Sequence, residues 1–220
     1  MSGDGFHPPL EEYLEAIHEL EEEGSALIQA RLAERVGHSA PSVSEMVRRL
    51  KTEGWIEANA RDLRLTKKGR AKAESVVRKH RLAERLLCDV IGLDWHKTHL
   101  EACRWEHVIS DEVEERLVAL LGNPSTCPHG NPIPGVPQDT EDVTPLAAAL
   151  VGDVVVLRRV TEEIEVDLQT LTYLHEHAFK PGTTATVKDK APDGTLMLSL
   201  DDHTLAVGPA LAACLFVAAG

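Results

Sequence analysis

Residues 38–66, HSAPSVSEMVRRLKTEGWIEANARDLRLT, carry the clearest structural signals of the N-terminal part of the chain. Pro41 suits the first turn of a helix, because its missing N–H would be unpaired there in any residue, and Gly54 is a natural end for that helix. Apolar residues recur between them at helical spacing, at Val43, Met46, Val47 and Leu50. Residues 55–66 then read as two short strands around a polar turn, which predicts a β-wing.

Two further helices are predicted before this stretch. Residues 8–24 repeat apolar side chains at helical spacing, and residues 28–36 form a shorter helical segment that Gly37 ends. Helix, turn, helix and hairpin together make a winged helix-turn-helix, in which the second helix of the pair enters the major groove of DNA and the wing lies along the phosphates. Winged helices also serve as protein-binding modules, so the motif alone leaves both partners open.

The charge distribution favours DNA as the partner. The whole chain has a net charge of −13, yet residues 28–79 hold 13 Lys and Arg against six Asp and Glu. A basic segment inside an acidic protein is typical of a DNA-contacting face, although a solvated helical face is basic too. Basic groups bond phosphates and short hydroxyls reach base edges. The predicted DNA-binding residues are Arg31, Ser39, Pro41, Ser42, Ser44, Glu45, Arg49 and Arg61.

The rest of the chain predicts a helical part and then a β-rich part. Apolar helices over residues 67–91, 95–108 and 110–121 exceed the needs of a winged helix, so we expect them to form a dimer that matches a palindromic operator. Six prolines mark residues 123–145 as a linker. Strands are predicted at 151–160, 183–188 and 195–200, with a helix at 166–178. The fold class is mainly α with small β parts (α+β), divided as 1–74 DNA-binding, 75–122 dimerisation and metal binding, 123–145 linker and 146–220 small barrel.

The chain carries no pattern of export or membrane insertion. The N-terminus lacks a basic start followed by an apolar run, and about 18 consecutive apolar residues occur nowhere. The four cysteines, at 88, 103, 127 and 214, show no C-x-x-C spacing. We therefore expect reduced thiols, a cytoplasmic location and no contact with a membrane.

Metal-ligand side chains gather on two predicted helices. His80 and Glu84 are four residues apart and share a helix face. A second stripe consists of His99, Cys103, Glu106 and His107, and the first helix carries Glu12. Imidazole, thiolate and carboxylate together suit a first-row transition metal. The alternatives are polar surface residues or a catalytic Cys–His pair, but no Gly-rich turn suggests an oxyanion site, so binding is favoured over catalysis.

Five stretches carry a resemblance to a known family. They are YLEAIHELEEEG (13–24), RKHRLAERLL (78–87), EACRWEHV (101–108), SDEVE (110–114) and NPIPG (131–135). Through them nearly the whole chain resembles the diphtheria toxin repressor family of iron- and manganese-dependent regulators. This resemblance implies an N-terminal winged helix, a helical dimerisation domain and a C-terminal SH3-like (FeoA-like) barrel.

The resemblance also implies two metal sites. The ancillary site would be His80, Glu84 and His99, with Asp167 as the acid from the barrel and Thr170 where relatives have Gln, for which Gln169 is a substitute. The primary, activating site would join a residue of the first helix to Cys103, Glu106 and His107. Iron-sensing relatives have Met at that position of the first helix, manganese-sensing relatives typically have a carboxylate, and this chain has Glu12.

These features predict a metal-dependent repressor that is not an enzyme. A hard carboxylate at Glu12 favours Mn²⁺, whereas Cys103 favours softer ions, so Fe²⁺ is the alternative cofactor, and Co²⁺, Ni²⁺, Zn²⁺ and Cd²⁺ are expected to bind in vitro. The metal would set the spacing of the two recognition helices of a homodimer on a palindromic operator and so control metal-ion homeostasis. The alternatives are an Fe²⁺-dependent repressor of iron uptake and, of another class, a Cys/His metallohydrolase.

Overall fold

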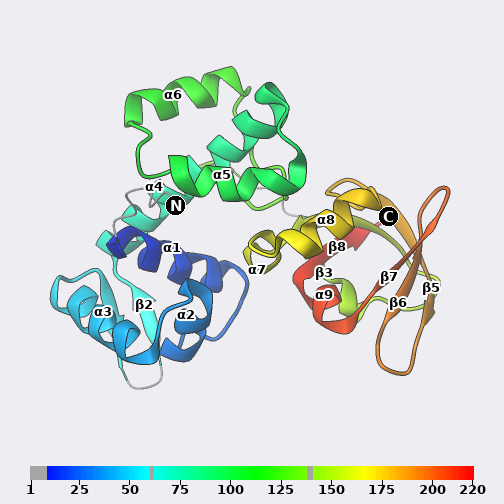
Figure 1. Cartoon of the computed structure of the whole chain (residues 1–220), viewed down its shortest axis with the longest axis horizontal. Helices are drawn as coiled ribbons and strands as arrows, with labels where there is room; N and C mark the ends of the chain where they lie inside the picture. The colour runs from blue at the N-terminus through cyan, green and yellow to red at the C-terminus, as the bar shows by residue number, and fades with distance from the viewer. Residues whose placement is uncertain (1–8, 60–61, 138–140) are drawn as a thin grey trace. The chain divides into compact units, whose positions relative to one another are not determined.

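Residues 9–59, 62–137 and 141–220 are described by a computed structural model of the chain, which divides into two units (Figure 1). The first unit comprises residues up to Ala83 together with Glu101–Gly122. The second comprises Glu84–Leu100 and Asn123–Gly220. No helix of the described residues has the length and apolar character needed to cross a membrane.

The first unit begins with the predicted winged helix-turn-helix. Its elements are α1 (Pro9–Glu22), α2 (Gln29–Val36), α3 (Ala40–Thr52) and the strands β1 (Ile56–Ala58) and β2 (Leu63–Leu65). The strands pair antiparallel, with Ile56 opposite Leu65. This confirms the three helices and the wing hairpin expected from the sequence.

Local sequence signals explain where the helix pair turns. Gly37 caps α2 with a left-handed φ of 65°, a conformation that costs glycine little. Ser39 caps α3, and its side chain accepts a hydrogen bond from the Ser42 N–H. The inner face of α3 buries Val43 and Leu50 completely in a core that includes residues of α1 and α2. Burial of this apolar stripe leaves the opposite face of α3 exposed to solvent.

The helices that follow complete the first unit. They are α4 (Lys67–Arg85), whose last two residues belong to the second unit, α5 (Thr98–Trp105), most of which lies in the first, and α6 (Asp111–Leu120). The Ser110 side chain caps α6 by accepting from the Val113 N–H at 3.3 Å. Helix α4 continues as a π-helical turn, η1 (Leu86–Ile91), and ends at Gly92 as expected. The predicted helix over 95–108 is shorter in the structure, a 3₁₀ turn, η2 (Trp95–Lys97), followed by α5.

An antiparallel sheet dominates the second unit. Its strands are β3 (Thr144–Pro145), β4 (Val154–Val160), β5 (Thr184–Lys190), β6 (Leu196–Ser199), β7 (Thr204–Val207) and β8 (Leu215–Ala219), in the order β3-β8-β4-β5-β6-β7. The helical elements are η3 (Leu146–Ala148), α7 (Glu162–Glu165), α8 (Leu168–Glu176) and α9 (Pro209–Cys214). The expected small SH3-like domain and the three predicted strands are confirmed.

Several elements of this unit were not predicted, above all β8 and α7. The C-terminal run LAACLFVAA switches from α9 to β8 in the middle of continuous apolar residues, where periodicity cannot separate a buried strand from a buried helix. Helix α7 is a single turn, too short to show a helical period. This short helix carries two buried carboxylates, Glu162 and Glu165.

Candidate metal centres and DNA-binding surface

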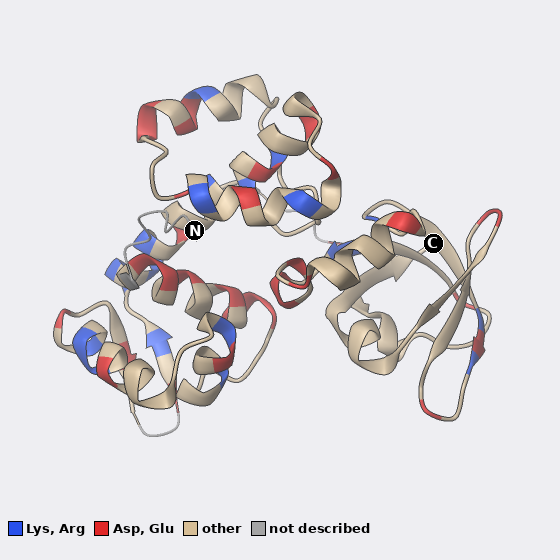
Figure 2. Cartoon of the chain, in the orientation of Figure 1, with Lys and Arg blue, Asp and Glu red and all other residues tan. Residues whose placement is uncertain are grey.

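A cluster of acidic and imidazole side chains lies within the first unit, between α1 and the residues just after α5. Figure 2 colours the acidic positions along α1 red. Each of Glu15, His80 and Glu106 offers a ligand atom, and these atoms lie within 4.8 Å of one another. His80 Nδ1 is 2.5 Å from Glu106 Oε2, and His107 Nε2 is 3.0 Å from Glu106 Oε1. We call these four residues the first cluster.

Helix geometry explains how α1 supplies this cluster. Glu11 and Glu15 are four residues apart and share one face of α1. Glu11 contacts His107, whose Nδ1 lies 2.6 Å from Glu11 Oε2. Glu12 lies on the same helix but is not in the group of close ligand atoms. The structure therefore places Glu15, and not the predicted Glu12, beside Glu106.

The electrostatics of the first cluster show crowded negative charge. Burial, and then the carboxylates of Glu106 and Glu19, raise the pKa of Glu15 well above its usual value. Burial would also raise the pKa of Glu106, but the His80 and His107 imidazoles outweigh it and lower this pKa to about 2. A cation among these groups would favour both carboxylates in the charged form. Cys103 is close enough that its thiolate form would add to the repulsion on Glu15.

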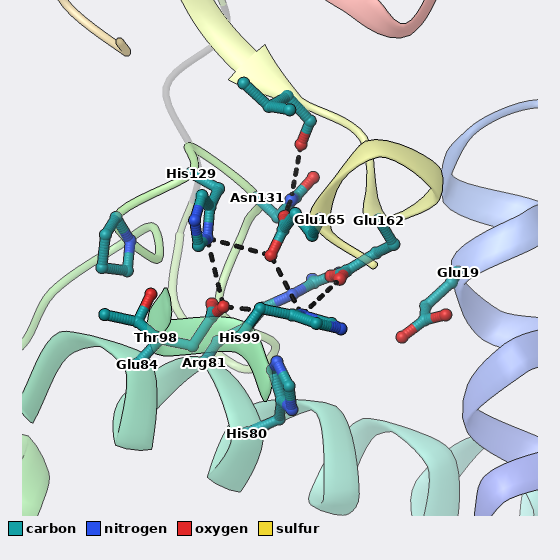
Figure 3. A network of polar contacts seen from close by, with 12 residues as sticks. Glu19, His80, Arg81, Glu84, Thr98, His99, His129, Asn131, Glu162 and Glu165 are labelled. Carbon is teal, nitrogen blue, oxygen red and sulfur yellow. Dashed lines mark hydrogen bonds and ion pairs between the residues drawn. The ribbon is translucent and has the colours of Figure 1, made fainter. Parts of the chain in front are cut away.

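A second cluster lies within the second unit and is almost wholly buried (Figure 3). His129 Nδ1 is 2.9 Å from Glu165 Oε2 and 3.1 Å from Glu84 Oε1. His99 Nδ1 is 3.2 Å from the same Glu165 oxygen and 3.5 Å from Glu162 Oε2. The ligand atoms of Glu84, Cys127 and His129 also lie within 4.8 Å of one another. We call these six residues the second cluster.

Hydrogen bonds from outside orient the second cluster. His129 Nε2 lies 3.3 Å from the Trp95 carbonyl oxygen, so this nitrogen donates and Nδ1 is left facing the carboxylates. Asn131 donates to Glu165 Oε1 at 2.5 Å and to the Val160 carbonyl at 2.8 Å. Metal-binding residues are commonly held by such partners.

The loop that carries Cys127 and His129 is fixed by two further residues. Arg85 Nε donates to the Thr126 carbonyl at 2.7 Å, and another of its nitrogens donates to the Cys127 carbonyl at 3.1 Å. Gly130 has a φ of 90°, and a Cβ at this position would lie 1.9 Å from the Arg158 carbonyl oxygen. Only glycine allows the loop to approach the β4 strand so closely.

The structure places Asp167, a ligand expected from the sequence, at the start of α8 and not among the six residues of the second cluster. Asp167 is exposed and caps α8, where it accepts from the N–H groups of Gln169 and Thr170 at 3.1 and 3.2 Å. Its carboxylate is occupied by the helix end, and the acids that face His99 are Glu162 and Glu165 of α7. The sequence reading also missed Cys127 and His129 because it treated their segment as a linker. Their signal was a Cys-Pro-His-Gly sequence, in which two metal-ligand types stand two residues apart.

The donor sets of both clusters fit a divalent cation. The second cluster holds three buried carboxylates beside two imidazoles and a thiol. Burial lowers the pKa of His129, but the carboxylates of Glu165 and Glu84 outweigh it and hold this pKa well above its usual value. Burial raises the pKa of Cys127 to about 12. Buried carboxylates are costly unless they are paired or coordinate a metal. A cation with mixed oxygen, nitrogen and sulfur ligands meets that requirement.

The predicted DNA-binding residues lie mostly around the exposed face of α3. Pro41, Ser42, Ser44 and Glu45 are exposed there, and Ser39 is exposed at its N-cap. Ser44 Oγ donates to Gln29 Oε1 at 2.8 Å, which links α3 to the start of α2. Two exposed arginines complete the described part of this surface, Arg31 beside Glu34 and Arg49 beside Glu53. The predicted wing contact Arg61 lies outside the described residues.

Comparisons with known proteins match most of the chain. Family models match residues 6–62 as the N-terminal DNA binding domain of iron dependent repressors, 66–135 as their metal binding and dimerisation domain, and 144–219 as a FeoA domain. The iron-dependent repressor IdeR of Mycobacterium tuberculosis is 44% identical over 205 residues, which cover 88% of this chain and 89% of that protein.

Two further similar proteins are a diphtheria toxin repressor and a manganese-dependent repressor. The diphtheria toxin repressor of Corynebacterium diphtheriae is 44% identical over 201 residues, covering 86% of this chain and 87% of that protein. A solved manganese-dependent transcriptional repressor in complex with manganese superposes with a TM-score of 0.86 at 30% identity, covering 96% of this chain and 100% of that one. All three relatives are repressors and not enzymes, which argues against the metallohydrolase alternative. The chain therefore belongs to the iron-dependent repressor family of metal-dependent, DNA-binding transcriptional repressors.

Proposed function

We propose that this repressor is activated by Mn²⁺ and then binds a palindromic operator as a homodimer, so that it controls genes of metal-ion homeostasis. The observation that carries the choice of metal is the pairing of Glu15 and Glu106 with His80 in the first cluster. Two carboxylates and an imidazole are the hard and intermediate donors that Mn²⁺ prefers.

The first cluster would hold the activating ion. The bound ion would supply a positive charge that neutralises the carboxylates of Glu15 and Glu106. Glu15 belongs to α1, the first helix of the DNA-binding part, whereas Glu106 and His107 follow α5. Metal contacts from Glu15, Glu106 and His107 would hold α1 against the end of α5. Because α1 shares a core with α2 and α3, this would also fix the position of the recognition helix α3. Metal favours DNA binding only if it binds more tightly to the arrangement of helices that fits DNA than to the arrangement that does not. The coupling free energy between two such binding events is typically about 1–3 kcal/mol.

The second cluster is proposed as an additional metal centre. Glu84, Glu162 and Glu165 provide oxygen, His99 and His129 nitrogen, and Cys127 sulfur. Such a centre would keep Glu84 and His99 of the ancillary site expected from the sequence and would draw its acids from α7 instead of Asp167. An ion there would fix α7 of the sheet domain to the segment that carries His99.

Iron is the competing activator. Cys103 stands beside the first cluster and Cys127 in the second, and thiolates favour ions softer than Mn²⁺. Relatives of 44% identity are also named as iron-dependent. We favour manganese because the first cluster is built around carboxylates. Operator binding titrated with each ion separates the two.

The DNA target would be read by α3. Ser42 and Glu45 would reach base edges, while Arg31 and Arg49 would bond phosphates. Binding to chromosomal DNA agrees with the cytoplasmic location expected from the sequence. A palindromic target needs two copies of the reader, one for each half-site.

Helix α6 provides a surface for that dimer. Val113 and Leu120 are 46% and 62% exposed and lie seven residues apart, on one face of the helix. Val108, just before the helix, is 72% exposed. A neighbouring group of exposed apolar side chains is typical of a protein–protein interface.

The test is operator binding measured without oxygen. Purified protein, stripped of metal, is mixed with the DNA upstream of its own gene while Mn²⁺, Fe²⁺ or Zn²⁺ is titrated. We expect half-maximal binding at free Mn²⁺ no higher than that for Fe²⁺, and none without metal. Activation by Fe²⁺ at tenfold or more lower free concentration would make the protein an iron sensor, and metal-independent binding would contradict the proposed activation.

A further inference from the structure

Two histidines lie against one another in the second unit, apart from the second cluster. His96 belongs to η2 and His175 to α8, and their ring centroids are 4.5 Å apart with the planes tilted by 49°. The Nδ1 atom of each ring is shielded from solvent and has no hydrogen-bond partner among the described residues. Leaving a buried polar atom unpaired costs about 1–3 kcal/mol, so two such atoms at one place call for an explanation.

The groups around the pair keep the His175 imidazole available to a metal. Burial, then the positive charge of Lys180 and the His96 ring, lower the pKa of His175, while Asp94 and Glu176 act in the opposite direction. His175 is therefore neutral at pH 7, and neutral imidazole is the form that binds metals. Asp94 adds a carboxylate near both rings and is held by Lys97 at 2.5 Å.

We propose that His96 and His175 form a third metal site, which binds a borderline ion such as Zn²⁺. Imidazole donors suit Zn²⁺, Ni²⁺ and Cu²⁺ better than Mn²⁺, which prefers oxygen ligands. The two imidazoles differ in this respect from both carboxylate-rich clusters. A bound ion would also satisfy the two Nδ1 atoms that have no hydrogen-bond partner in the described ranges.

The position of the pair gives this site a consequence for the second cluster. His96 precedes the cluster residue His99 by three positions, and α8 follows directly after α7, which carries Glu162 and Glu165. The two histidines thus join the same two segments that the second cluster joins. An ion at the pair would change the affinity of the second cluster, and by linkage an ion in the second cluster would change the affinity of the pair by the same factor.

The alternative is that the rings only pack as an aromatic pair. Bound Zn²⁺ per chain is measured after equilibrium dialysis against micromolar Zn²⁺ for the full-length protein and for His96→Gln and His175→Gln. His177→Gln is the matched control, because His177 is next to the same helix but its Nδ1 is already bonded to the Tyr173 carbonyl at 2.8 Å. We expect both test variants to bind one Zn²⁺ fewer than the wild type and the control to bind the same number.

A second measurement uses the unaltered protein, so that misfolded variants cannot obscure the result. In ¹⁵N-histidine spectra, Zn²⁺ should shift the ring nitrogens of both His96 and His175 at a saturable stoichiometry. Unchanged stoichiometry in folded variants, or ring resonances that do not respond to Zn²⁺, would overturn the proposal and leave the pair as packing.

Discussion

His129 Nδ1 lies 2.9 Å from Glu165 Oε2, although the two residues are 36 positions apart in the sequence. The contact joins the loop before the sheet to α7, and the Trp95 carbonyl fixes which ring nitrogen faces the carboxylate. A pair placed in this way, with Glu84 3.1 Å from the same nitrogen, forms the centre of the second cluster.

We expect Glu165→Gln to weaken metal binding at the second cluster by at least about tenfold, since loss of a ligand costs no less than loss of a supporting hydrogen bond. Asp167→Asn is the control, because Asn caps a helix as well as Asp and the residue is exposed. Isothermal titration with Mn²⁺ and with Zn²⁺ measures both. Equal losses in the two variants would restore Asp167 as the ligand.

Glu15→Gln should abolish activation by Mn²⁺, whereas Glu12→Gln should leave it within about threefold of the wild type. The reason is that Glu15, and not Glu12, is grouped with His80 and Glu106. Operator binding against free Mn²⁺ is the measurement. If Glu12 is the activating ligand as the sequence suggested, Glu12→Met will instead shift the preference toward Fe²⁺, Co²⁺ or Ni²⁺.

Arg49→Ala should weaken binding to all DNA sequences alike and reduce the slope of log affinity against log salt by about one, as for a lost phosphate contact. Its side chain is 61% exposed on α3. Glu45→Gln should instead change which operator sequence is preferred. Fluorescence anisotropy at several salt concentrations distinguishes these outcomes, and altered sequence preference in Arg49→Ala would count against its phosphate role.

The double variant Val113→Glu and Leu120→Glu should be monomeric at micromolar concentration, because like charges on one face of α6 would meet across a symmetric interface. Light scattering with saturating Mn²⁺ gives the mass. Glu112→Ala and Glu115→Ala, on the same helix, serve as the control and should leave the dimer intact. A dimeric double variant would place the interface elsewhere.

Stability should fall in acid through the buried ion pair of Glu22 and Arg81. Arg81 is completely buried and donates to Glu22 Oε2 at 2.6 Å. Burial would raise the pKa of Glu22, but His18 and Arg81 outweigh it and lower this pKa to about 2. A lowered pKa stabilises the fold above the unfolded value near 4.3 and the effect is lost as the pH falls toward 2, by roughly 3 kcal/mol at most.

Urea unfolding between pH 7 and pH 3 measures this loss. Glu22→Gln should start less stable and then lose less free energy of unfolding with acid than the wild type. Glu21→Gln is the control, since its partner Arg70 and Glu21 itself are about 40% exposed and such pairs contribute little. Parallel acid profiles for the wild type and Glu22→Gln would contradict the role of this pair.

The winged helix-turn-helix could be predicted from local sequence alone. Its helix boundaries are marked by Pro41, Gly37 and Gly54. The buried face of α3 follows from the apolar spacing of Val43, Met46, Val47 and Leu50. These are local signals, because a helix repeats every 3.6 residues and its ends depend on neighbouring residues. For the same reason, the ligand types at His80, Glu106 and His107 could be recognised from their helical spacing.

Which residues complete each cluster depends on how distant segments pack together in three dimensions. The choice of Glu15 over Glu12 depends on how α1 faces Glu106, since two acids three residues apart on one helix look alike in sequence. Glu165 meets His129 and Glu84 through the packing of a one-turn helix against a distant loop, which leaves no period in the sequence. The family resemblance implied Asp167 as the acid, yet its carboxylate accepts hydrogen bonds from the first N–H groups of α8. The first N–H groups of every helix lack partners within the helix and need such an acceptor.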